Sequence, residues 1–281
     1  MAIGRSASHL KCMIEPIAYF GLVDDEDLEL AAAALELAAL DHPDLDLDPY
    51  AAQLFAMAER LAEVGQDAHT SAQMASALAR VIGEEYGFAG DRDTYDDPRN
   101  ADMICVIDRR RGLPVSLAIL YVAAARRVGW VAEALNTPGH VLVRVGADTA
   151  PVLIDPFNGG RQVAPEQLAE LVAQAIGADT KVLPDHVAAM SNRAVLTRLL
   201  VNMATRAQAR GDAARARVLY ARINAFAPMD ANAWWQGARL ALAAGEVDEA
   251  RASLMALLEI TRDPRLRDQV HEILQRIAAA G

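Results

Sequence analysis

The chain has 281 residues, of which 53% are hydrophobic and 23% charged, a length that suits one large or two ordinary globular domains. Its 38 acidic side chains outnumber the 27 basic ones, and the formal net charge of −11 repels polyphosphates, which argues against nucleic-acid binding. The longest strongly apolar stretch, 117–125, is too short to cross a bilayer, which takes about 20 residues, so no membrane association is expected.

The N-terminal residues and the cysteines indicate a cytoplasmic protein. Charged or polar residues at Arg5, His9, Lys11 and Glu15 interrupt the apolar positions, so no continuous apolar core for a secretory signal is present. The two cysteines, Cys12 and Cys105, are far apart and lack the spacing of a metal site. We therefore expect no disulfide, no metal site and no cofactor.

The first third of the chain predicts helices. Apolar residues recur at helical spacing near 28–38, two further helices are expected at 49–64 and 70–85, and Gly65 and Gly87 are suitable ends. Two prolines in 41–49 interrupt this helical pattern. The next segment, 90–100, is rich in turn formers and charge, which predicts an ordered loop leading into a short helix at 101–109.

The segment 112–160 contains the clearest strand signals. The helix expected from residue 117, directly after Ser116, is apolar on every face over its first nine residues, so we expect it at the centre of its domain. Two β-rich runs follow, 140–145 and 151–155, separated by the turn-forming residues 146–149. These runs predict an antiparallel hairpin.

From residue 191 the chain returns to helices with an internal period. Gly211 and Gly245 are 34 residues apart, as are Ala216 and Ala250, and this period is typical of tetratricopeptide repeats. The spacing predicts two such repeats and a final helix near 265–279. A non-repeating helical bundle with the same spacing by coincidence is the alternative.

The expected hairpin brings two polar residues together. If 146–149 form its loop, His140 lies directly opposite Asp155, close enough for a carboxylate to hydrogen-bond the imidazole. Ser116 lies at the start of the buried helix, where unpaired N–H groups favour a developing anion. A nucleophile, a base and an orienting carboxylate are the groups that acyl transfer requires.

Each member of this trio also has a purely structural interpretation. Ser116 follows a proline and precedes an apolar helix, as a helix N-cap does. His140 and Asp155 can form a structural hydrogen bond, and Asp155 before a proline can begin a turn. Asn136 can donate to a substrate or hold its local backbone, and both alternatives remain open.

Five ordered motifs, at 95–100, 110–117, 125–129, 136–140 and 154–160, resemble the SirB-type bacterial branch of the transglutaminase-like superfamily. The resemblance implies an α+β, mostly helical chain with a papain/transglutaminase-like core, a small antiparallel sheet and C-terminal tetratricopeptide repeats. The corresponding domains are an N-terminal helical part at 1–90, the core at 91–185 and the repeats at 190–281. The same resemblance implies that the catalytic positions are Ser116, His140 and Asp155. It places Tyr95, Asn100 and Asn136 beside the cleft.

Two functions are consistent with this pattern. Active members of the superfamily carry cysteine where this chain has Ser116, which favours a non-enzymatic module that binds a protein or peptide partner. The alternative is an acyltransferase or hydrolase that acts on an amide or ester through a Ser-His-Asp triad. The sequence predicts neither the partner nor the oligomeric state.

Overall fold

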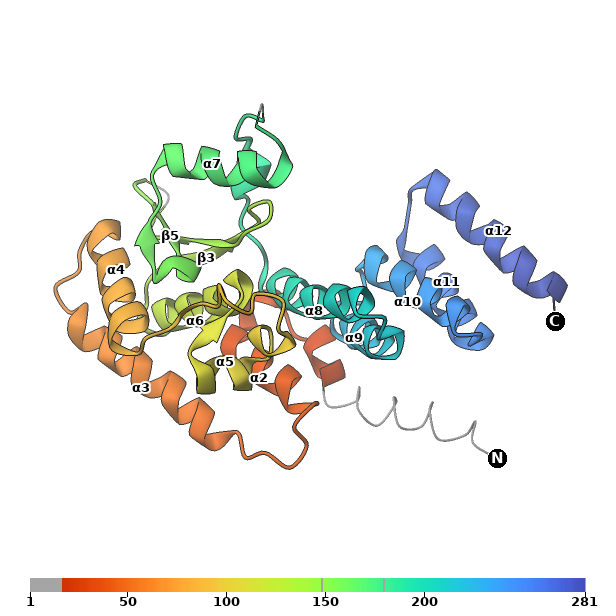
Figure 1. Ribbon diagram of the computed structural model, residues 1–281, viewed down its shortest axis with the longest axis horizontal. Coiled ribbons are helices and arrows are strands. Elements are labelled where there is room, and N and C mark those ends of the chain that lie inside the picture. Colours follow the sequence, from red (N-terminus) through yellow and green to blue (C-terminus); the bar gives the residue numbers. More distant parts are fainter. Residues whose placement is uncertain (1–16, 148, 179, 281) are drawn as a thin grey trace. The chain divides into compact units, whose positions relative to one another are not determined.

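A computed structural model describes residues 17–147, 149–178 and 180–280 (Figure 1). The chain forms two compact units, one of residues 25–199 and the other of residues 17–24 together with 200–280. The boundary between the two units falls inside helix α8 (Asn192–Ala209). The α+β, mostly helical architecture expected from the sequence is confirmed.

The larger unit begins with the expected helices. They are α2 (Leu30–Ala39), α3 (Asp48–Val64) and α4 (Ser71–Leu78). Thr70 and Gln73 form a reciprocal capping box at the start of α4. Beyond α4 the chain continues as a wider π-helix, η3 (Ala79–Glu85), which the sequence did not predict. The short 3-10 turn η2 (Asp25–Asp27) precedes these helices.

Helix α6 (Pro114–Arg127) is the centre of this unit, as predicted from its apolar sequence. Its residues are buried from Pro114 through Val122, and it packs against α2, α3 and the sheet. The shorter helix α5 (Met103–Arg109) packs against α2. Two short parallel strands, β1 (Ala89–Gly90) and β2 (Arg111–Gly112), flank the loop that ends in η4 (Pro98–Asn100) and leads into α5.

A four-stranded antiparallel sheet packs beside α6. In spatial order its strands are β3 (Ala132–Leu135), β4 (Leu142–Val145), β5 (Val152–Asp155) and β6 (Arg161–Gln162). The two expected strands are confirmed as β4 and β5, whereas β3 and β6 were not predicted. Helix α7 (Pro165–Ile176) lies over the sheet (Figure 1) and buries Leu168 and Val172 against Leu135 and Leu142.

The hairpin register differs from the expected one by two residues. Val143 lies opposite Ile154, whereas a loop of 146–149 would have placed Val141 there. The ladder ends at Val145 and Val152, so the connection is longer than predicted. A shift of two residues keeps every side chain on its expected face, because strand side chains alternate with a period of two.

The other unit is a series of helices that form antiparallel neighbours. They are the C-terminal part of α8, α9 (Ala213–Phe226), α10 (Ala231–Ala243), α11 (Val247–Ile260) and α12 (Pro264–Ala280). Helix α10 packs against both α9 and α11, and α12 packs against α11. The turn η1 (Tyr19–Gly21) also belongs here, because it packs against α9. None of the helices described is long and apolar enough to traverse a bilayer.

Candidate functional site

His140 and Asp155 form a hydrogen-bonded pair in the larger unit. His140 lies in the turn before β4, Asp155 is the last residue of β5, and His140 Nε2 lies 2.9 Å from Asp155 Oδ1. Both side chains are largely buried. The pairing expected from the sequence is therefore present, although the two residues are not directly opposite partners in the ladder.

Asp155 is also the N-cap of the turn η5 (Pro156–Asn158). It accepts hydrogen bonds from the backbone N–H of Phe157, at 2.9 Å, and from both the backbone and the side chain of Asn158. Burial by itself would raise the pKa of Asp155, but the hydrogen bonds from His140 and Asn158 outweigh it, so this pKa lies below its usual value. The carboxylate thus stays charged at neutral pH and orients the imidazole.

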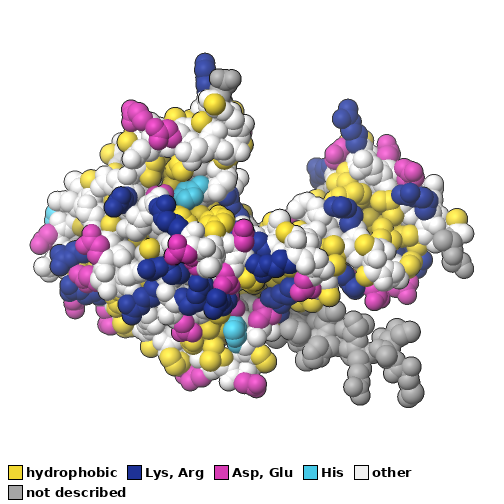
Figure 2. Space-filling view, viewed as in Figure 1, with side chains coloured by type: hydrophobic (Ala, Val, Ile, Leu, Met, Phe, Trp, Pro, Cys, Tyr) yellow, Lys and Arg dark blue, Asp and Glu magenta, His cyan; other side chains and the backbone are white. Residues whose placement is uncertain are grey.

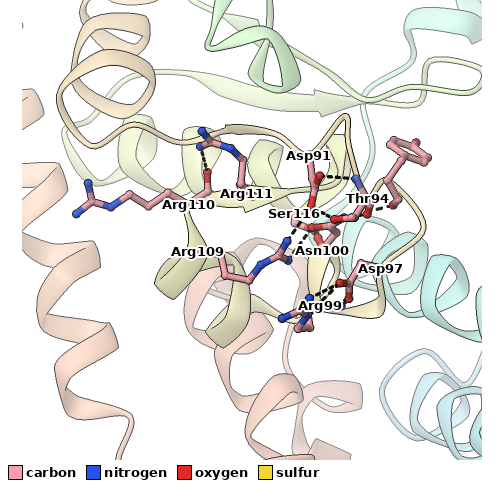
Figure 3. Close-up of polar contacts among 10 residues, drawn as sticks. Asp91, Thr94, Asp97, Arg99, Asn100, Arg109, Arg110, Arg111 and Ser116 are labelled. Carbon is pink, nitrogen blue, oxygen red and sulfur yellow. Dashed lines mark hydrogen bonds and ion pairs between the residues drawn. The ribbon is translucent and has the colours of Figure 1, made fainter.

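Ser116 is not part of this pair. It is the third residue of α6, its side chain is 0% exposed, and its hydroxyl donates to the backbone carbonyl of Asn100 at 2.7 Å (Figure 3). The N-cap of α6 is Leu113, so the alternative role of Ser116 as an N-cap is wrong. Among the residues described, the Ser116 proton is committed to a carbonyl and not to the His140 imidazole.

Asn100 ties the charged loop to the start of α6. Its side-chain nitrogen donates to the carbonyl of Thr94 at 2.7 Å, and its side-chain oxygen accepts from Arg109 at 2.9 Å. Its backbone carbonyl accepts from Leu113 as well as from Ser116. Because Asn100 is 0% exposed, the structure puts it inside this network and not on a cleft wall, where the sequence had suggested it.

Asp91 and Arg109 complete the network (Figure 3). Asp91 accepts from the hydroxyl of Thr94 at 2.6 Å and from Arg109 at 2.8 Å. Burial opposes its ionisation, but these hydrogen bonds prevail and hold the pKa of Asp91 well below its usual range. Arg109 therefore binds side chains inside the fold, whereas Arg111 donates to the backbone carbonyls of Gly87 and Arg110.

Phe157 packs against both Tyr95 and His140. The Phe157 ring packs edge to face with Tyr95 at 5.9 Å and with His140 at 6.0 Å between centroids. Gly90 permits this placement, since a Cβ there would lie 2.4 Å from the Phe157 ring. Tyr95 is 39% exposed, so the aromatic group extends from the buried pair to the surface.

Arg198 fixes the turn that carries His140. Its guanidinium donates to the carbonyl of His140 at 2.6 Å, to the carbonyl of Thr137 at 3.1 Å and to the side chain of Asn136. Asn136 thus has its side-chain oxygen bound to this arginine, next to His140. The sequence did not indicate Arg198, because it lies about 60 residues further along the chain, on α8.

An open cavity of about 310 Å³ reaches Asp155. Its walls come from β5, β6 and α7, and carboxamide side chains are prominent among them. The lining residues are Asp155, Asn158, Arg161, Gln162, Val163, Gln167, Glu170, Leu171 and Gln174. A cavity of this kind offers hydrogen-bond donors and acceptors beside the His140–Asp155 pair.

Cys105 lies with a different histidine and carboxylate. Its Sγ and ligand atoms of His42 and Asp102 are all within 4.8 Å of one another. Burial, followed by the nearby charge of Asp102, raises the pKa of the Cys105 thiol to about 11, so it is protonated at neutral pH. The sequence had predicted no such group, because His42 is remote from the other two residues in sequence.

The surface of the larger unit carries mixed charge. On the face shown in Figure 2, the Lys and Arg side chains of the larger unit lie mainly in its lower half, with Asp and Glu side chains among them. Arg60, for example, pairs with Glu85 at 2.7 Å, and Arg144 pairs with Glu133.

Comparison with known proteins finds similar sequences and a similar solved structure. A UPF0162 protein of Xylella fastidiosa (strain 9a5c) is 35% identical over 184 residues, which cover 64% of this chain and 66% of that protein. Human F-box only protein 21 is 32% identical over 114 residues, covering 38% of this chain and 18% of that protein. The crystal structure of menin is similar at a TM-score of 0.40 and 12% identity, covering 94% of this chain and 74% of menin.

The family model described as the transglutaminase-like superfamily matches residues 48–201. This range contains α6, the sheet and the His140–Asp155 pair, and it is more than half of the chain. The chain therefore belongs to the transglutaminase-like superfamily.

Proposed function

We propose that this protein is a non-enzymatic binding module that uses a transglutaminase-like core to hold a segment of a protein or peptide partner. The observation that carries the proposal is the burial of Ser116, whose hydroxyl donates to the Asn100 carbonyl. A nucleophile has to reach both its base and a substrate. Ser116 has neither the exposure nor the hydrogen bond to act in this way.

The hydrogen-bonding groups beside Asp155 also support binding rather than bond cleavage. His140 is oriented through Nε2, and no hydrogen bond of its Nδ1 is found among the described residues, so this nitrogen can donate to or accept from a ligand. The cavity beside Asp155 is lined by Gln162, Gln167 and Gln174, whose carboxamides both donate and accept hydrogen bonds. Such side chains suit the alternating N–H and C=O groups of a peptide backbone.

The helical unit supports the SirB-type assignment with tetratricopeptide repeats, which is also part of the proposal. Gly211 and Gly245, 34 residues apart, have φ of +78° and +77° in the turns between successive helices. Ala216 and Ala250, at the same separation, are both 0% exposed. Matching turn conformations and matching buried positions are what a helix-hairpin repeat requires.

An activity test separates this proposal from the enzyme alternative. The full chain, Ser116→Ala and His140→Ala are incubated with a fluorophosphonate probe and with ester and amide substrates. We expect no labelling or turnover above that of Ser116→Ala. Turnover that depends on Ser116 and His140 would overturn the proposal and establish the triad enzyme, whose motivation is the oriented His140–Asp155 pair.

A binding test addresses the cavity itself. A displayed library of random linear peptides is selected on the full chain, and enriched peptides are measured by calorimetry against two charge-reversal variants on α7. Glu170→Arg changes the cavity wall, whereas Glu166→Arg is the matched control, because Glu166 is exposed on the same helix but does not line the cavity. We expect only Glu170→Arg to weaken binding. Equal effects of both variants, or no enriched peptide, would contradict a peptide site here.

A further inference from the structure

A second polar cluster lies in the larger unit, outside the cavity beside Asp155. His42 Nε2 lies 2.8 Å from Asp102 Oδ2, and Cys105 Sγ is within 4.8 Å of both ligand atoms. Imidazole nitrogen, carboxylate oxygen and thiolate sulfur are the three protein ligands that Zn²⁺ prefers. Nothing in the proposed binding function uses these residues.

The three side chains come from elements that are held in place. His42 lies in the turn just after α2, where its N–H donates to Ala39 and its carbonyl accepts from Leu45. Asp102 is the N-cap of α5, and its Oδ1 accepts from the Cys105 N–H at 3.0 Å. Because α2 packs against α5, the two backbones fix the relative positions of the three ligands.

The cap also determines how Asp102 presents its carboxylate. Oδ1 is committed to the helix N-terminus, which leaves Oδ2 facing His42. A carboxylate held in this way binds a metal through one oxygen, which is how Asp ligates Zn²⁺ in tetrahedral sites. His42 is about one-third exposed, so an ion can reach the cluster from solvent.

We propose that His42, Asp102 and Cys105 form a binding site for a divalent transition-metal ion, with Zn²⁺ as the ion it fits best and water as the fourth ligand. One carboxylate and one thiolate balance the charge of a divalent ion, and the sulfur excludes the hard cations Mg²⁺ and Ca²⁺ as preferred occupants. Binding releases the thiol proton of Cys105 to solvent as the Zn–S bond forms.

The geometry needs only side-chain adjustment. Zn–N and Zn–O bonds of about 2.1 Å and a Zn–S bond of about 2.3 Å separate tetrahedral ligand atoms by about 3.3–3.6 Å. The His42–Asp102 contact of 2.8 Å would open slightly, while the sulfur, within 4.8 Å of both, would move inward. Asp108 lies one helical turn beyond Cys105 on α5, where it accepts a hydrogen bond from the Tyr50 hydroxyl at 3.2 Å.

Cobalt(II) provides a direct readout of this site. The metal-free full chain is titrated with Co²⁺, and absorption is recorded in the near ultraviolet and visible. We expect a thiolate-to-cobalt charge-transfer band and intense d–d bands at one equivalent, followed by their loss when Zn²⁺ is added. Absence of a saturable charge-transfer band in the wild-type chain would overturn the proposal.

Variants assign the ligands. Cys105→Ser and His42→Gln should each lower the Zn²⁺ affinity by about 100-fold or more, since loss of an outer-shell partner alone costs about 10–100-fold. Asp102→Asn should do the same while keeping the cap, because asparagine is an equally good N-cap. Circular dichroism melting of each variant shows that the fold persists.

Matched controls distinguish this site from unspecific binding. Cys12→Ser removes the other cysteine and His69→Gln removes an exposed histidine elsewhere in the chain, and both should leave the cobalt spectrum and the Zn²⁺ affinity unchanged. A band that survives in Cys105→Ser, or that disappears in Cys12→Ser, would show that the metal binds elsewhere and would overturn the assignment.

Discussion

His140 and Asp155 are hydrogen-bonded at 2.9 Å although neither faces the other across the hairpin ladder. The histidine reaches the carboxylate from the turn before β4, and Arg198 holds that turn through the carbonyls of Thr137 and His140. Orientation of the imidazole thus depends on α8 as well as on the sheet. Ser116, the nucleophile expected from the sequence, is buried and donates its hydroxyl proton to the Asn100 carbonyl.

Asp155→Asn should alter the pH dependence of stability. The folded pKa of Asp155 lies below its unfolded value of about 3.9, so in the acid range the unfolded chain binds more protons and stability rises with pH. The contribution is complete above that unfolded value and is lost as pH falls through the folded pKa. Urea unfolding of both proteins should show a difference at about pH 5 that shrinks as the pH is lowered further. A difference that grows as pH falls would contradict the pairing.

Ser116→Ala should be mildly destabilising. The mutation removes a buried hydrogen bond to the Asn100 carbonyl, which keeps a second donor in the Leu113 N–H at 2.9 Å. We expect a loss of about 1 kcal/mol in the free energy of unfolding, as for a typical intramolecular hydrogen bond. In Ser116→Cys, measured in parallel, the new thiol should not react with iodoacetamide while the chain is folded, because the side chain at this position is buried.

Tyr121→Phe should leave stability unchanged or increase it. The Tyr121 hydroxyl is fully buried in α6 and has no hydrogen-bond partner among the described residues. Desolvation of an unpaired hydroxyl costs about 1–3 kcal/mol, which phenylalanine avoids at nearly the same volume. Thermal unfolding measures the change, and a clear fall in melting temperature would reveal a partner for this hydroxyl.

Substitutions of Gly159 and Gly160, which follow η5, test how closely the chain packs there. Both have positive φ, +70° and +77°, but a Cβ at Gly159 meets nothing within 4 Å, whereas one at Gly160 would lie 2.7 Å from the Tyr121 ring and 2.9 Å from the Ala79 backbone. Gly159→Ala should cost about 1–2 kcal/mol for the left-handed backbone alone. Gly160→Ala should cost clearly more in chemical denaturation, and equal costs would contradict the close packing.

The periodicity of apolar residues predicted the helices and the helix at the centre of the core. Helix α3 begins within a residue of its expected start and ends at the expected Val64, and α6 is buried as its uninterrupted apolar sequence indicated. Strand β3 was missed because Ala132 to Leu135 contains alanine and glutamate, which are depleted in strands, and only pairing with β4 makes it extended.

The site was predictable only in part, for a physical reason. The two expected strands, 140–145 and 151–155, brought His140 and Asp155 together, and the pair is present although His140 lies before β4 and the register differs by two residues. The partner of Ser116 is an atom of Asn100, on a loop whose path depends on tertiary contacts that periodicity does not encode. The proximity of His42 to Asp102 likewise depends on tertiary contacts that periodicity does not encode.

The hydrogen bonds of Asn100 couple the loop before α5 to the central helix α6. Its carbonyl closes the first turn of α6, and its side chain spans the loop from Thr94 to Arg109. Local opening of the loop would therefore fray the central helix, so the free energy for opening approaches that for global unfolding. Although Arg92 and Arg99 are exposed, trypsin should cut after them at the rate of global unfolding, and the Leu113 amide should exchange with deuterium just as slowly.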